Sequence, residues 1–223
     1  MPADRQYPEI DDAFFRRDEE LRDKVVLPLA RRRGDVAACL EIAERLLAEE
    51  ADPECRGAMI SAVSHALHCG GEVDLSWAWC LRSVEEQPDH PLTLNGPAAW
   101  LYYTPLGEPT ADDLRRALDY NLVALEKARE AECWQRSILH DRCRIATSAG
   151  RWDVVEAAMR EILEVWRNPR NPDIPMFEWD WLDRVPDGVL DAGLLADYRG
   201  VMERVLEFRR RRDEGEAPGD PEP

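Results

Sequence analysis

The sequence predicts an all-α fold, a solenoid of helix-turn-helix repeats with a C-terminal capping helix. Three observations predict it. Apolar residues recur with helical spacing in almost every window of residues 10–168. Short Gly or Pro turns are the only interruptions of that pattern. A Gly-centred phrase also returns at these turns with separations of 37, 36 and 43 residues, close to the period of roughly 34 to 47 residues found in helix-pair solenoids.

Each expected helix has a signal of its own. The recurring phrase opens four helices, at Gly34, Gly71, Gly107 and Gly150. Thr110, followed three residues later by Asp113, is a capping box that starts the third of them. Apolar stripes mark the last two of these helices: Leu114, Leu118, Leu122 and Leu125, then Val154, Ala158, Ile162 and Val165. Since each stripe needs a covering neighbour, we expect about four helix pairs in a repeat region spanning residues 1–168.

The remainder, 169–212, is expected to belong to the same domain. Three prolines within 168–175 predict an extended connection, because proline interrupts helices. The alternating aromatics of 177–181 predict an extended segment packed over the solenoid end, although a contact surface stays open as an alternative. A last helix over about 187–212 would place on one face Leu190, Leu194, Tyr198, Val201, Val205 and Phe208. The Gly-, Pro- and acid-rich tail 213–223 is expected to be disordered.

The stretch 57–90 resembles the tetratricopeptide repeat. The residues that carry the resemblance are Ile60, Val63, Ser64 and Leu67 in the first helix, Ser76, Cys80 and Ser83 in the second, and the closing Pro88. Ser64 and Ser76 are small, which indicates a close helix crossing. Other copies depart from the pattern, through Pro97, Pro105 and Val155. The resemblance implies a right-handed solenoid that binds proteins, with the first helix of each pair lining a concave groove.

Composition excludes several classes of protein. Acidic residues outnumber basic ones by 46 to 29, a net charge of −17, which disfavours nonspecific nucleic-acid binding. The acid concentrates in residues 34–90, with 12 acidic and 3 basic side chains. No run of 18 apolar residues and no signal-peptide pattern is found, so we expect a cytoplasmic protein without a membrane partner. Six scattered cysteines without a CxxC motif are expected to be free thiols.

The resemblance assigns the groove. Alignment on the turn glycines gives these candidate ligand-contacting residues: Lys24, Arg31, Ser61, His65, His68, His140 and Arg144. Their side chains imply a neutral-to-basic groove rich in hydrogen-bond donors. The prediction is an adaptor-type interaction module that holds a peptide or helix of a partner protein, with a carboxylate-bearing segment as the favoured ligand. The oligomeric state stays open.

The sequence leaves two other functions open. The spacing of His65 with His68, and of His140 with Cys143, could supply metal ligands, but such incomplete motifs more often belong to a groove or core, so we expect no metal or cofactor. No motif of a known catalytic class is present, which favours a non-enzyme. The alternative function is an acidic inhibitor or immunity-type protein that covers a basic enzyme surface with Glu72, Asp74, Glu85 and Glu86.

Overall fold

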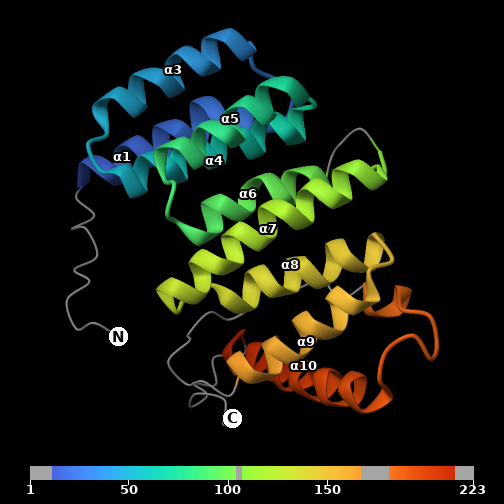
Figure 1. Cartoon of the computed structure of the whole chain (residues 1–223). Coiled ribbons are helices and arrows are strands. Elements are labelled where there is room, and N and C mark those ends of the chain that lie inside the picture. The colour runs from blue at the N-terminus through green and yellow to red at the C-terminus, as the bar shows by residue number, and fades with distance from the viewer. Residues whose placement is uncertain (1–11, 104–106, 167–180, 214–223) are drawn as a thin grey trace. The chain divides into compact units, whose positions relative to one another are not determined.

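The computed structural model describes residues 12–103, 107–166 and 181–213 of the chain. Within these residues the structure is helical and contains no β-strand, which confirms the predicted all-α class (Figure 1). None of the six cysteines, all of which lie in the described residues, forms a disulfide. None of the described helices combines the length and apolar character that a membrane crossing needs. The chain divides into two compact units, Met1–Pro109 and Thr110–Pro223, here called the N-terminal and C-terminal units.

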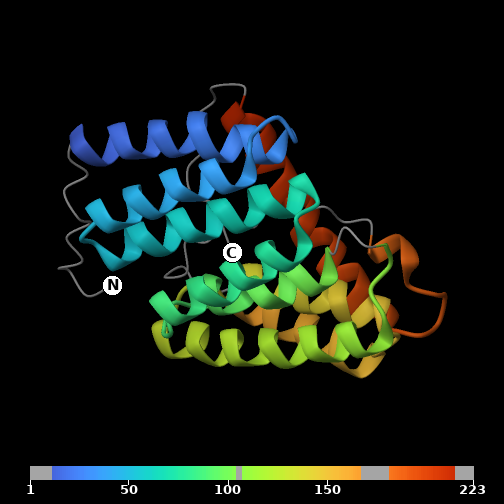
Figure 2. The same ribbon diagram turned by 90° about the horizontal axis from the view of Figure 1, so that it is seen from above.

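The N-terminal unit begins with a continuous helical path. It comprises α1 (Asp12–Leu21), a π-helical turn η1 (Arg22–Val26) and α2 (Leu27–Ala30), which pack against α3 (Val36–Glu49) and α4 (Pro53–Gly70). Figure 2 shows these helices lying side by side. The unit continues with α5 (Val73–Glu86) and α6 (Pro91–Tyr102). Its core contains Leu21, Val25, Leu29, Leu46, Ile60, Val63, Leu67 and Trp79, all buried.

Local chemistry fixes where α4 begins and ends. The Asp52 carboxylate accepts hydrogen bonds from the backbone N–H groups of Glu54 and Cys55, and Pro53 occupies the first helical position, where its missing N–H has no consequence. Gly71 ends the helix in the left-handed conformation, with φ of 86°. The chain can therefore turn at once into α5, which begins at Val73, as the phrase at Gly71 predicts.

The crossing of α4 and α5 depends on two serines. Ser64 Oγ donates to the Ser76 carbonyl and Ser76 Oγ donates to the Ser64 carbonyl, each at 2.9 Å. Both side chains are buried, and a larger residue at either position would separate the helices. The close crossing expected from their small size is confirmed.

The C-terminal unit contains α7 (Ala111–Ala131), α8 (Gln135–Ser148), α9 (Trp152–Trp166), a 3₁₀ turn η2 (Leu182–Arg184) and α10 (Ala192–Asp213). The predicted capping box is present, since Asp113 N–H donates to Thr110 Oγ1 and Thr110 N–H donates to the Asp113 carboxylate. Helix α8 packs against both α7 and α9, and α10 packs against α9. Gly150 makes the turn into α9 with φ of 65°.

The last helix starts later than the sequence predicts. It begins at Ala192 rather than near 187, because the Asp191 carboxylate accepts the backbone N–H of Leu194 at 2.7 Å and caps the helix there. Its predicted apolar face is confirmed where side chains are described: Leu190, Leu194, Tyr198 and Val201 are buried. The side chains of Val205 and Phe208, the connection up to residue 180 with Phe177 and Trp179, and the tail from 214 lie outside the described residues.

Candidate functional site

A cavity of about 560 Å³ opens in the N-terminal unit between α4, α5 and α6. Residues from α4 lining it are Glu54, Ala58, Ser61, Ser64, His65 and His68. The α5 side and the following turn contribute Cys80, Ser83, Gln87 and the α6 cap His90. Helix α6 and its C-terminal cap contribute Leu92, Thr93, Gly96, Ala99, Trp100 and Tyr103. Several lining side chains, including Ser61, His65 and Tyr103, are exposed, so solvent reaches the cavity.

The cavity extends along α4 and α6. Its α4 wall runs from Glu54 to His68, a rise of roughly 20 Å at 1.5 Å per residue. The wall has this length because residues spaced three or four apart repeat on one face of an α-helix. The α6 wall follows the same rule from Leu92 to Tyr103. Small residues occupy the middle of both walls, Ala58 on α4 and Gly96 on α6, which leaves the space between them open.

Hydrogen bonds within the protein occupy most polar groups at the cavity floor. Ser83 Oγ donates to the Cys80 carbonyl at 2.7 Å. Thr93 Oγ1 donates to Gln87 Oε1 at 2.8 Å, while Gln87 Nε2 donates to the backbone carbonyl of Glu54 at 3.3 Å. The two bonds of Gln87 join the end of α5 to the start of α4 and to the start of α6, so these three elements are linked at the cavity floor.

Aromatic side chains form one end of the cavity. The centroid of the Trp100 ring lies 4.9 Å from that of the Trp77 ring. It lies 5.9 Å from the centroid of the His68 imidazole, which it meets edge-on. Trp100 Nε1 donates to Ser76 Oγ at 2.7 Å, which ties the ring to the serine pair at the α4–α5 crossing. The indole is therefore held in position before any ligand arrives.

His68 is neutral at physiological pH. Its Nε2 lies 2.7 Å from the Tyr103 carbonyl oxygen. Since a carbonyl only accepts, Nε2 carries the proton and donates it to this bond. Burial lowers the pKa of His68, and that effect exceeds the opposing one of the Tyr103 bond. The side chain joins the end of α4 to the end of α6 and adds no charge.

The cavity thiol is unreactive, because burial raises the pKa of Cys80 to about 12. On the exposed side of α4, His65 Nε2 lies 3.6 Å from Cys69 Sγ. His65 nevertheless lines the cavity. Within the described part of the chain, no group of three His, Cys, Asp or Glu side chains has a geometry that could hold a metal ion.

The predicted groove residues separate into three places. Ser61, His65 and His68 lie together on the α4 wall of the cavity. Lys24 and Arg31 belong to the N-terminal unit but do not line the cavity: Lys24 pairs with Glu20 at 2.8 Å, and Arg31 is exposed at the end of α2. The basic character that these two residues were expected to give the groove is therefore absent from this cavity.

His140 and Arg144 do not line the cavity either. Both lie in the C-terminal unit and are buried, with exposed fractions of 2% and 7%. Trp181 Nε1 donates to His140 Nε2 at 3.1 Å, and the Trp181 ring also packs against Tyr198 of α10. The reason is that Trp181, from the segment after α9, covers this face of α8, which an open repeat would leave free. His140 is a core residue.

Sequence reasoning missed the α6 wall. Pro97 lies inside α6, and together with Pro105 it makes this stretch a poor copy of the repeat, so the resemblance assigns no groove residue here. A signal was present: Leu92, Gly96, Ala99 and Tyr103 recur with helical spacing. That spacing places them on one face but does not identify what the face meets.

Comparison with protein-family models, curated proteins and solved structures found no match to this chain.

Proposed function

We propose that the protein is a non-enzymatic interaction module whose α4–α6 cavity receives a segment of a partner protein. The observation that carries this proposal is the shape of the cavity, which extends along almost the whole of α4. A length of roughly 20 Å accommodates about six extended residues or about four helical turns. A compact metabolite would leave much of this length empty, whereas a peptide segment fills it.

The chemistry of the lining supports binding over catalysis. Ser83, the buried lining hydroxyl beside Cys80, donates to a backbone carbonyl, and the Cys80 thiol stays protonated at physiological pH. Nucleophilic catalysis needs a hydroxyl or thiol that is activated by a neighbouring base. The floor of the described cavity instead uses its polar groups to hold the helices together, as a preorganised binding surface does.

We also propose that the helix pairs α4–α5 and α8–α9 are copies of one repeat, in a tetratricopeptide-like right-handed solenoid. Two observations support the proposal. Each pair is joined by a tight turn at a glycine with positive φ, Gly71 and Gly150. In both pairs the two helices also pack closely against each other. A repeat origin would explain why the module binds through a face formed by consecutive helices.

A display selection tests the binding function. The full chain would be screened against a random 16-residue peptide library, and every enriched peptide tested on two variants. Ala58→Trp places an indole in the cavity, whereas Ala78→Trp places the same side chain on an exposed position of α5 that does not line it. We expect Ala58→Trp to abolish binding and Ala78→Trp to preserve it. Peptides that bind all three proteins equally would refute the proposal.

The acidic-inhibitor function predicts a different result. Its exposed acidic side chains Glu72, Asp74 and Glu85 do not line the cavity. Glu86 is less available, because it pairs with Arg56 at 2.7 Å. If charge reversal at the three exposed acids abolished partner binding while Ala58→Trp had no effect, the inhibitor function would replace the proposed one.

A further inference from the structure

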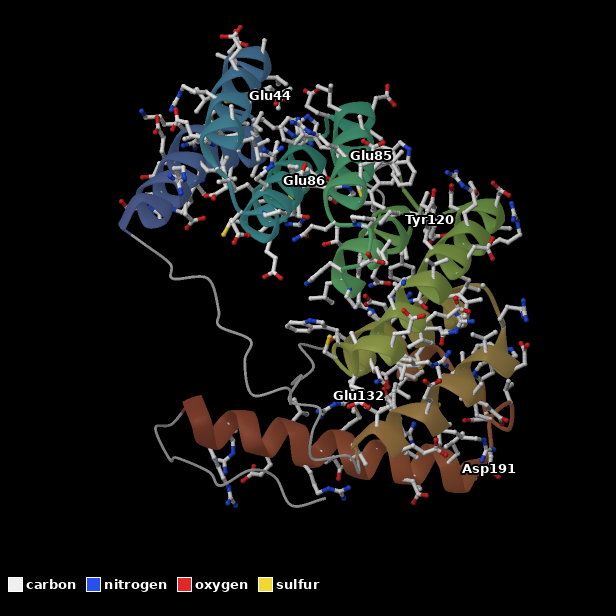
Figure 3. All side chains as sticks on the ribbon, turned by 60° about the vertical axis from the view of Figure 1, so that its left-hand side comes forward. Glu44, Glu85, Glu86, Tyr120, Glu132 and Asp191 are labelled. Carbon is white, nitrogen blue, oxygen red and sulfur yellow. The ribbon has the colours of Figure 1, made fainter. Side chains whose placement is uncertain are left out.

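The cations near the cavity are already neutralised by the protein. Residues 34–90, which build two of its three walls, contain only three basic side chains. Arg45 pairs with Glu20 at 2.8 Å, Arg56 with Glu86 at 2.7 Å, and Arg82 with Glu44 at 2.9 Å. Glu44 and Glu86 are labelled in Figure 3, on α3 and at the end of α5. A ligand carboxylate entering the cavity would therefore find no unpaired cation in this stretch.

The lining itself carries one acid. Among the described lining residues, Glu54 is the only Asp, Glu, Lys or Arg. It lies in the first turn of α4, at one end of the cavity, and is exposed. Its backbone carbonyl accepts from Gln87, while its carboxylate makes no ion pair within the described chain. This end of the cavity therefore favours a positive charge.

The remaining wall surface is mainly apolar. Ala58, Leu92, Gly96, Ala99 and the Trp100 ring present carbon atoms to the open space. Several hydroxyl and amide groups between them, those of Thr93 and Gln87 among them, are occupied by bonds inside the protein. Removing apolar side chains of a ligand from water is favourable on such a surface, and the bonded hydroxyl and amide groups keep their partners inside the protein.

We propose that the bound segment is apolar and basic: its apolar side chains lie between α4 and α6, and a lysine or arginine at one end pairs with Glu54. This inference rests on the proposed function and names the partner's chemistry. It reverses the charge expected from the sequence, because Lys24, Arg31 and Arg144 are absent from the cavity. The acid of the surrounding chain adds long-range attraction for such a segment.

The charge of the selected peptides tests the inference. We consider the peptides whose binding is abolished by Ala58→Trp and preserved by Ala78→Trp. In these peptides we expect Lys and Arg to be enriched over Asp and Glu, relative to their frequencies in the unselected library. The strongest binder would then be synthesised with its charged positions as selected, all replaced by Gln, and all replaced by Glu. Fluorescence anisotropy with the full chain should rank affinities in the order basic, neutral, acidic, with the basic advantage shrinking as salt is added.

A pair of matched variants locates the charge. Glu54→Gln should weaken the affinity for the basic peptide about three- to fivefold, which is the effect of one exposed ion pair. The affinity for the Gln-substituted peptide should not change. Glu41→Gln removes the same charge from an exposed position on α3 that does not line the cavity, and should have no such effect. Cavity-dependent peptides rich in acid, or equal effects of the two variants, would overturn the inference while the binding function stands. Absence of any cavity-dependent peptide would overturn the function itself.

Discussion

His140 illustrates how burial controls ionisation at a single residue. It lies in the core of the C-terminal unit, where its Nε2 accepts a hydrogen bond from Trp181. Burial, assisted by the charge of Arg144, lowers the pKa of His140 from 6.5 to about 3. The imidazole is consequently neutral in the folded protein throughout the physiological range, with Nε2 as the unprotonated nitrogen.

This ionisation predicts an acid-dependent stability. Between about pH 6.5 and pH 3 the unfolded chain binds a proton at His140 that the folded chain does not, so the stability that the neutral form contributes above pH 6.5 is lost as the pH falls. Lowering the pH from 7.5 to 5 should therefore decrease the free energy of unfolding by about 2 kcal/mol through His140. His140→Gln, which keeps an acceptor for Trp181, should remove that part of the pH dependence.

Urea unfolding of both proteins at several pH values measures the difference directly. The variant is expected to be less stable at pH 7.5 and to lose less stability on acidification. His68, whose pKa is also lowered, is common to both proteins and cancels in the comparison. Parallel stability curves for the two proteins would show that His140 does not titrate as argued.

At the residue scale, the sequence predicts contacts that depend on neighbours in the chain better than those that depend on distant ones. The small size of Ser64 and Ser76 indicated a close crossing, and the paired hydrogen bonds confirm it. The hydrogen bond from Trp100 to Ser76 joins residues that are 24 positions apart, and the sequence around either residue does not predict it. His65 and His140 look alike in the sequence, yet one lines a cavity and the other is buried.

At the scale of the elements, helix starts are the best-predicted feature. Three of the recurring phrases mark the first residues of α3, α5 and α9, and the Thr110 capping box marks α7. These signals are local, since a cap needs only the three or four residues around it. The start of α10 was placed too early because the preceding turn is stabilised by Asp191 rather than by a Gly-centred phrase.

Two glycines inside helices should respond in opposite ways to alanine. At Gly70, the last residue of α4, an added Cβ would lie 2.6 Å from the carbonyl oxygen of Leu29, so α2 would have to move. Gly70→Ala should destabilise the protein by about 1 to 3 kcal/mol. Gly200, inside α10, has room for a Cβ, since its nearest atom is the end of the Arg204 side chain at 4.0 Å. Gly200→Ala should stabilise by about 0.5 to 1 kcal/mol, because alanine loses less backbone freedom in a helix.

Chemical denaturation followed by circular dichroism would measure both changes. The contrast is more informative than either value, because the substitution is the same and only the surroundings differ. A stabilising Gly70→Ala would mean that α2 and α4 can separate without loss of packing.

At the scale of the whole molecule, the all-α class follows from periodicity, but the site does not. The cavity forms because α6, which contains Pro97 and is capped by His90, lies beside a helix that precedes it by some forty residues. Which faces meet is decided by packing among α4, α5 and α6, and no spacing in the sequence encodes it. The predicted charge of the groove differs from that of the cavity for the same reason. Lys24, Arg31 and Arg144 occupy groove positions in the repeat alignment, but none of them lines the cavity.

The N-terminal unit should fold without the rest of the chain. Its core draws on Leu21, Val25, Leu46, Leu67 and Trp79, and every member of that cluster precedes residue 80. All residues that line the cavity precede residue 104. A unit of about 110 residues is also long enough to bury a stable core.

Residues 1–109 expressed alone should therefore give a helical protein with a single cooperative thermal transition. They should also bind the cavity-dependent peptides within about threefold of the full chain's affinity, because the binding surface is complete within this unit. The fragment carrying Ala58→Trp is the control, since it should fold equally well and fail to bind. A fragment that folds cooperatively yet binds none of those peptides would show that the C-terminal unit contributes to the site.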